Sequence, residues 1–216
     1  DGHFGRLNLT TSWYYAYGQQ ESTRLPGVDE KIRAWFTATE LSMDFDWLRP
    51  RLSILYASGD DDPFDRRAEG FDAIFENPQF AGADTSFWIR QNVPLIGGGG
   101  ITLSGRNGVL PSLRSSKEQG QSNFINPGLF LLGIGVDADI LPQLRVSANI
   151  NRLSLDSTEV LERLRQQSRI ADHLGYDASL SLIWRPYMSQ NVVVRLSAAE
   201  LIPGDGFDDL YGKEAD

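Results

Sequence analysis

The residues from Gly128 to Leu155 constrain the fold most, because they carry the alternating pattern of a β-hairpin. From Leu132 to Ile140 every even position is apolar and every odd position is glycine or aspartate. After Leu141-Pro142-Gln143 the alternation resumes in phase, and the even positions of 144–150 are again apolar. Successive side chains of a strand point to opposite faces. The stretch therefore predicts two strands joined by a tight turn, with one apolar and one polar face.

The same alternation recurs elsewhere in the chain. We predict further strands at about 4–17, 31–45, 51–58, 176–184 and 192–199, which makes seven with the two of the hairpin. In the second of these, Phe36 falls on the polar face, which predicts either a bulge or an aromatic side chain that faces inward. Apolar residues on one face and polar residues on the other are typical of a membrane barrel, with lipid outside and a lumen inside.

The predicted connections alternate between short and long. Short turns are expected near 46–50, 141–143 and 186–191, and long polar connections at 18–30, 59–127 and 156–173 and in the tail from Pro203. Outer-membrane barrels of Gram-negative bacteria alternate in this way, with tight periplasmic turns and long extracellular loops. The alternation favours such a barrel over a soluble one.

Composition excludes several classes of protein. The longest apolar run, around Leu129 to Val136, is far shorter than the roughly 20 residues of a transmembrane helix. A membrane role would therefore have to come from strands closed into a barrel, which alone satisfy their backbone groups in lipid. The net charge of −9 argues against a nucleic-acid partner. The chain has no cysteine, which removes disulfides and thiolate chemistry.

The fold class that follows is all-β, an antiparallel transmembrane β-barrel with long extracellular loops. We expect residues 1–216 to form a single segment with about 7–8 strands of a larger barrel, because bacterial barrels have an even number of strands and no signal peptide opens the chain. An eighth strand near 87–93 or 100–103 would weaken that expectation.

Two of the long connections are expected to have structure of their own. Residues 59–127 are far longer than a usual loop and rich in aromatic residues, so we expect them to fold over the mouth of the barrel or into its lumen. Residues 156–173 predict a loop with a short helix, capped by Asp156, Ser157 or Thr158.

Some loop motifs resemble those of a known family. Ala57-Ser58-Gly59-Asp60-Asp61-Asp62-Pro63, followed by Gly70-Phe71-Asp72-Ala73-Ile74-Phe75, resembles the alginate-export family of outer-membrane channels, as does the closing stretch from Pro203 to Gly212. The resemblance covers roughly the second half of a family member and implies a wide, many-stranded channel. Glu76-Asn77-Pro78-Gln79 departs from the family pattern, so alginate is not carried over as the substrate.

The candidate functional residues are polar side chains that share the inner face. Mixed charge in a lumen can select and orient polar solutes, although a salt-bridged lining without selectivity is the alternative. The candidate lumen-lining residues are Arg6, Glu40, Asp44, Arg51, Asp137, Asp139, Arg145, Asn149, Asp177, Arg185 and Arg195. A weak Ca²⁺ site is a second hypothesis, since Asp60, Asp61, Asp62 and Asp65 offer oxygen ligands without the spacing of an EF-hand. No cofactor besides this loosely bound Ca²⁺ is predicted.

The sequence thus predicts a porin-like channel in the bacterial outer membrane that passes a polar or anionic solute, such as an oligosaccharide or an organic acid. One alternative is a structural barrel that sheathes or anchors other envelope proteins. Another is a soluble β-barrel that binds a ligand. No enzyme is predicted, because Gly133-Ile134-Gly135 lies within a strand and both histidines, His3 and His173, stand alone. The expected partners are outer-membrane lipid and a small polar solute.

Overall fold

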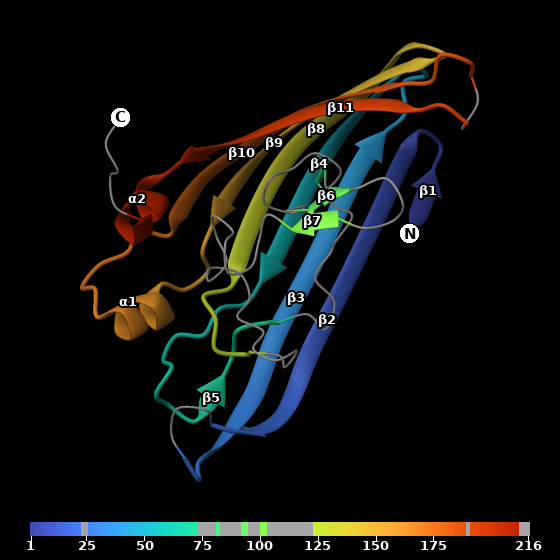
Figure 1. Cartoon of the computed structure of the whole chain (residues 1–216). Coiled ribbons are helices and arrows are strands. Elements are labelled where there is room, and N and C mark those ends of the chain that lie inside the picture. The colour runs from blue at the N-terminus through green and yellow to red at the C-terminus, as the bar shows by residue number, and fades with distance from the viewer. Residues whose placement is uncertain are drawn as a thin grey trace.

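One large antiparallel sheet forms most of the molecule (Figure 1). The computed structural model describes residues 1–22, 26–72, 81–82, 92–94, 100–102, 123–188 and 191–211. Seven long strands make up the sheet, and they are β2 (Leu7–Glu21), β3 (Asp29–Met43), β4 (Leu48–Ala57), β8 (Leu129–Leu141), β9 (Leu144–Ser154), β10 (His173–Trp184) and β11 (Val194–Pro203). Their order in the sheet follows the chain, and every neighbouring pair of these seven is antiparallel. The prediction of an all-β antiparallel fold is confirmed.

Four further strands among the described residues are short. β1 (Gly2–Phe4) pairs with the start of β2 through a turn at Gly5, whose φ of 63° suits glycine. β5 (Arg67–Ala68) pairs with β3, whereas β6 (Asn92–Pro94) and β7 (Gly100–Thr102) form a separate two-stranded sheet. Across the described residues the main sheet is open, with β1 and β11 at its edges. The possible eighth strand near 87–93 or 100–103 is therefore not part of the main sheet where those residues are described.

The hairpin of 128–155 has the predicted register. Ile134 lies opposite Ile150 and Val136 opposite Ala148, so both strands place their even positions on the same face. Phe36 pairs regularly with Tyr14 and Ala57 and stacks on Phe71 at 5.0 Å between ring centroids. Phe36 is thus an inward-facing aromatic residue rather than a bulge.

Two strand boundaries differ from the prediction because strands extend beyond their alternating core. The first predicted strand is in fact two, β1 and β2, and β2 and β3 run on into the expected loop of 18–30 until only residues 22–28 connect them. Ser22 N donates a hydrogen bond to Val28 O at 2.8 Å across that link. The turn expected at 46–50 is made by residues 44–47, where Asp46 has a left-handed φ of 53°.

These boundaries make the alternation of loop lengths less strict than predicted. The connections 22–28, 58–128 and 155–172 meet at one end of the sheet, called here the loop end. The connections 5–6, 44–47, 142–143 and 185–193 meet at the other, called here the turn end. The 22–28 link, with seven residues, is shorter than the 185–193 link, with nine, so the loop end is distinguished chiefly by its two long connections.

Two short helices lie at the loop end (Figure 1). Helix α1 (Glu159–Arg165) has Thr158 at its N-cap position and buries Val160 and Leu161. Helix α2 (Asp205–Tyr211) follows β11 directly, where the resemblance implied a loop. Two hydrogen bonds of Asp209 hold helix α2 in place. The Asp209 carboxylate accepts a hydrogen bond from Ala171 N at 2.9 Å, and the Asp209 carbonyl accepts one from Gln167 Nε2 at 2.7 Å. Among the described residues, no helix is both long enough and apolar enough to cross a membrane.

Candidate inner-face site

The two faces of the main sheet differ sharply in chemistry. One row of paired residues across the outer face consists of Leu9, Leu41, Leu52, Ile134, Ile150 and Ala178 and ends at Glu200 on the edge strand. A neighbouring row across the inner face consists of Asn8, Ser42, Arg51, Gly135, Asn149, Ser179 and Ala199. In these two rows the alternation predicted from the sequence becomes an apolar outer face and a largely polar inner face.

The apolar outer face is open to its surroundings. Leu132, Ile134 and Leu180 are 40%, 59% and 54% exposed, far more than residues of a packed core. Its charged exceptions are Arg152 on β9, Glu200 on the edge strand and, toward the loop end of β2 and β3, Glu21, Asp29, Lys31 and Arg33. An exposed apolar surface of this extent marks contact with a partner or a membrane.

Buried apolar residues collect instead on the inner side at the loop end. Leu55, Leu131 and Leu153 pair across β4, β8 and β9 on the inner face. They belong to one cluster with residues of the strand ends, of both helices and of the connections, namely Ala81, Leu129, Leu155, Leu161, Ile170, Leu174 and Leu210. The inner face is therefore apolar and covered at the loop end, and polar from its middle to the turn end. The sequence alternation predicted a polar inner face along its whole length and not this apolar end, although the odd positions Leu129, Leu131 and Leu153 carried the signal.

Most of the candidate lumen residues share the polar part of the inner face. Register places Glu40, Arg51, Asp137, Asp139, Arg145, Asn149, Asp177 and Arg195 on that one face of their strands. Asp44 follows β3, and Arg185 follows β10, where its N–H donates to Gln143 O at 2.8 Å. Arg6 lies in the β1–β2 turn, so its assignment to a strand face was wrong.

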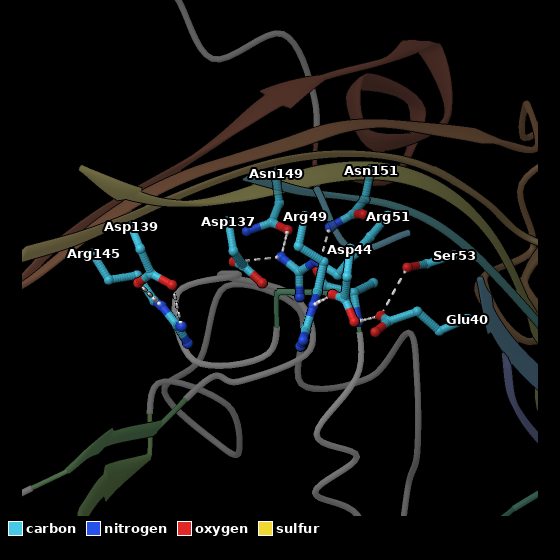
Figure 2. A network of polar contacts seen from close by, with 11 residues as sticks. Glu40, Asp44, Arg49, Arg51, Ser53, Asp137, Asp139, Arg145, Asn149 and Asn151 are labelled. Atoms are coloured by element: carbon cyan, nitrogen blue, oxygen red, sulfur yellow. Dashed lines mark hydrogen bonds and ion pairs between the residues drawn. The ribbon is translucent and has the colours of Figure 1, made fainter. Parts of the chain in front are cut away.

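Ion pairs organise these charges (Figure 2). Arg145 donates two hydrogen bonds to Asp139, Nε to Oδ1 at 2.7 Å and Nη2 to Oδ2 at 2.8 Å, in the bidentate geometry that is the strongest for such a pair. Arg51 is held more loosely: its Nη2 donates to Asn149 Oδ1 at 2.6 Å and lies 3.3 Å from Asp137 Oδ1. Asp44 contacts Arg49, which belongs to β4 and not to the turn predicted near 46–50. The hydrogen bond from Asn8, together with Arg49, lowers the pKa of Asp44.

Residues 81–82 of the long connection rest on the middle of this face. Asn151 Nδ2 donates to Ala81 O at 3.1 Å, and Ala81 N donates to Glu40 Oε2 at 3.4 Å, while Ser53 Oγ donates to the same carboxylate oxygen at 3.0 Å. Gly82 packs directly against the Asn149 side chain. Figure 2 shows the green β6–β7 hairpin on the side of the sheet toward which the labelled side chains point. The rest of residues 59–127 lies largely outside the described residues, so its expected position in the lumen stays a prediction.

Glycines on β8 make room for the two asparagines on β9. A Cβ at Gly133 would clash with Asn151 Oδ1, whereas a Cβ at Gly18, an inner-face glycine of β2, would meet nothing within 4 Å. We therefore expect Gly133→Ala to lower the free energy of unfolding by about 1–3 kcal/mol, because Asn151 must move and its bond to Ala81 is lost. Gly18→Ala should be neutral or stabilising by up to about 1 kcal/mol. Urea unfolding followed by tryptophan fluorescence compares them, and equal effects would contradict the fit of Asn151 against Gly133.

A second polar cluster joins the connections at the loop end through hydrogen bonds. Asp60 is 1% exposed, and its main-chain N–H donates to Asn126 O at 2.8 Å. Its Oδ1 accepts from Glu69 N at 2.9 Å, and its carbonyl accepts from Ser157 Oγ at 2.6 Å. Asp60 Oδ2 is buried without a hydrogen-bond partner. Burial raises the pKa of Asp60 to about 7, with smaller contributions from Asp65 and Asp61.

These contacts do not support the hypothesis of a Ca²⁺ site. Asp62 and Asp65 accept hydrogen bonds from Phe64 N at 3.0 Å and Arg67 N at 2.6 Å, so they act as turn-forming residues. Within the part of the chain that the structure describes, which includes Asp60, Asp61, Asp62 and Asp65, no three Asp, Glu or His side chains are grouped to hold a metal ion. The weak Ca²⁺ site stays a prediction without structural support.

Comparisons with protein families and with curated proteins gave no match for this chain. The resemblance of the Asp60 and Phe71 loop motifs to the alginate-export family stays a prediction.

Proposed function

We propose that this chain forms part of the wall of an outer-membrane β-barrel and that its polar face lines a path for a small polar or anionic solute. The observation that carries the proposal is the pair of rows described above, apolar and exposed on one face and polar and ion-paired on the other. In a bilayer the outer face would replace water by lipid tails, which suits Ile134 and Leu180 and their neighbours.

Aromatic residues support this orientation. One group lies toward the loop end of the outer face and consists of Trp13, Tyr15, Tyr17, Trp35, Tyr56, Phe130 and Tyr176. A second group lies near the turn end and consists of Phe45, Trp47, Trp184 and Tyr187. Tyr176 and Trp184 are eight residues apart on β10, which corresponds to about 27 Å along the strand. Barrel proteins place aromatic girdles on either side of an apolar band about 25 Å tall.

The covered inner face shapes the proposed path. Leu161, Ile170 and Leu210 pack over the inner side at the loop end, and Ala81 rests at its middle. A solute would therefore pass through a narrowed interior lined by charged pairs rather than through a wide, unobstructed pore. Narrow polar linings select solutes by local charge and hydrogen bonding.

The proposal is tested with the purified protein. We expect it to require detergent for solubility, to show heat-modifiable mobility on a gel, and to give discrete conductance steps in planar bilayers. A monomer that stays soluble without detergent would contradict the membrane assignment. A detergent-dependent barrel without conductance would instead support the structural alternative, in which the barrel sheathes or anchors another protein.

A further inference from the structure

Buried N–H donors without acceptors lie on the polar part of the inner face. Among the described side chains these are Arg51 Nε, Asn149 Nδ2 and, beside the turn end, Arg185 Nε. The other buried side-chain atoms in the same condition lie at the loop end and are one oxygen each of Glu30 and Asp60 and Nδ1 of His173. A buried polar group without a partner is costly, so such a group calls for a ligand, an ion or water. The inner face is therefore short of hydrogen-bond acceptors.

Two of these donors are neighbours. Arg51 on β4 and Asn149 on β9 are joined by the 2.6 Å hydrogen bond from Nη2 to Oδ1, and Gly135 of β8 stands between them in the register. A Cβ at Gly135 would lie 2.3 Å from Asn149 Oδ1 and 3.1 Å from Arg51 Nη2, so the glycine makes the room in which these two side chains meet. The remaining donors of both side chains are thus held next to each other.

The charge of Arg51 is only partly neutralised. Its contact with Asp137 is a single one at 3.3 Å, in contrast to the two bonds of 2.7 and 2.8 Å that Arg145 makes to Asp139. Guanidinium groups bind carboxylates by donating from neighbouring N–H groups, and Arg51 keeps Nε for this purpose. Arg145 has already used its Nε and Nη2 on Asp139.

We propose that Arg51 and Asn149 form a subsite for the carboxylate of an anionic solute. One carboxylate oxygen accepts from Arg51 Nε and the other from Asn149 Nδ2. Gly82 packs against Cγ and Nδ2 of Asn149, so a bound carboxylate displaces residues 81–82 from this spot. This inference rests on the proposed function and narrows its solute from a polar or anionic molecule to one that carries a carboxylate.

The test compares gluconate with sorbitol, which has an alcohol in place of the carboxylate. Isothermal titration calorimetry on the purified protein in detergent should show gluconate binding and no sorbitol binding. Arg51→Gln should weaken gluconate binding at least tenfold, whereas Arg163→Gln, at an exposed position of helix α1, should leave it within about twofold. Equal gluconate affinity in the wild type and Arg51→Gln, or an equal loss in Arg163→Gln, would overturn the subsite.

A second variant covers the case in which Arg51→Gln does not fold. Asn149→Asp keeps the shape of the side chain, removes the amide donor and places a negative charge beside Arg51. It should abolish gluconate binding while circular dichroism stays that of the wild type, and retained binding would overturn the proposal. Conductance in planar bilayers is measured separately. Conductance without gluconate binding contradicts only the subsite, and gluconate binding without conductance contradicts only the channel.

Discussion

Ile134→Arg is expected to destabilise the protein in a bilayer by about 2–4 kcal/mol, the cost measured for a cationic side chain at the membrane midplane on a barrel's lipid face. Ile134 lies in the middle of β8 and in the row that joins Leu52 to Ile150. It is 59% exposed, and substitutions at such surface positions in water usually change stability by no more than about 0.5 kcal/mol. The size of the effect therefore reports what surrounds the outer face.

Ile140→Arg is the matched control. Ile140 is on the same strand, is 52% exposed, and lies one residue from the end of β8 at the turn end. Near the membrane interface the same substitution should cost only about 0–1 kcal/mol. Reversible urea unfolding in lipid vesicles measures both variants. Equal and small effects for Ile134→Arg and Ile140→Arg would place the outer face in water or against a protein.

Asp60→Asn is expected to remove a pH dependence of stability that acts through the loop-end cluster. The pKa of Asp60 is raised from 3.8 to about 7 in the folded protein. Between these values the folded protein keeps the proton and the unfolded chain loses it, so the free energy of unfolding falls as pH rises, by about 1.4 kcal/mol per pH unit. Below pH 3.8 both states are protonated, and above about 7 both are ionised, so the fall is confined to that window.

The measurement is the difference in unfolding free energy between Asp60→Asn and the wild type at pH 5 and at pH 8. The difference should shift in favour of the variant by up to about 3 kcal/mol, because two pH units of the window lie above pH 5. Asparagine can still accept the hydrogen bond from Glu69 N. Asp61→Asn, at the exposed neighbouring position, is the control and should show no such shift. Parallel pH profiles for Asp60→Asn and the wild type would contradict an ionisable buried carboxyl.

Period-two alternation was enough to predict the long strands and their faces. Ile134 and Ile150 shared a face in the sequence pattern, and the register confirms it. Strand ends were harder to predict. The residues of 18–30 are mostly polar, and their pattern does not distinguish a strand from a loop. β2 and β3 continue there because Gln19, Gln20 and Glu21 find partners in Lys31, Glu30 and Asp29. Backbone pairing across strands decided the boundary, and no local pattern reports that.

In the candidate site too, the face of each residue was predictable from the sequence, whereas its partner was not. The odd positions Asp137, Asp139 and Arg145 were assigned from parity alone, and parity placed them together. Which arginine is saturated by its partner depended on cross-strand register: Arg145 lies opposite Asp139, whereas Arg51 lies opposite Gly135. The contact between Asn151 and Ala81 joins residues 70 positions apart, and no periodicity predicts it.

The most direct test of the central claim is the environment of alternate residues on β9. The chain has no cysteine, so single-cysteine variants at 145, 146, 147, 148 and 150 can each carry a spin label in lipid bilayers. We predict that labels at 146, 148 and 150 are accessible to oxygen dissolved in lipid, and that labels at 145 and 147, on the inner face, are accessible only to a water-soluble relaxation agent. Uniform accessibility to the water-soluble agent at all five positions would contradict a barrel wall whose even face meets lipid.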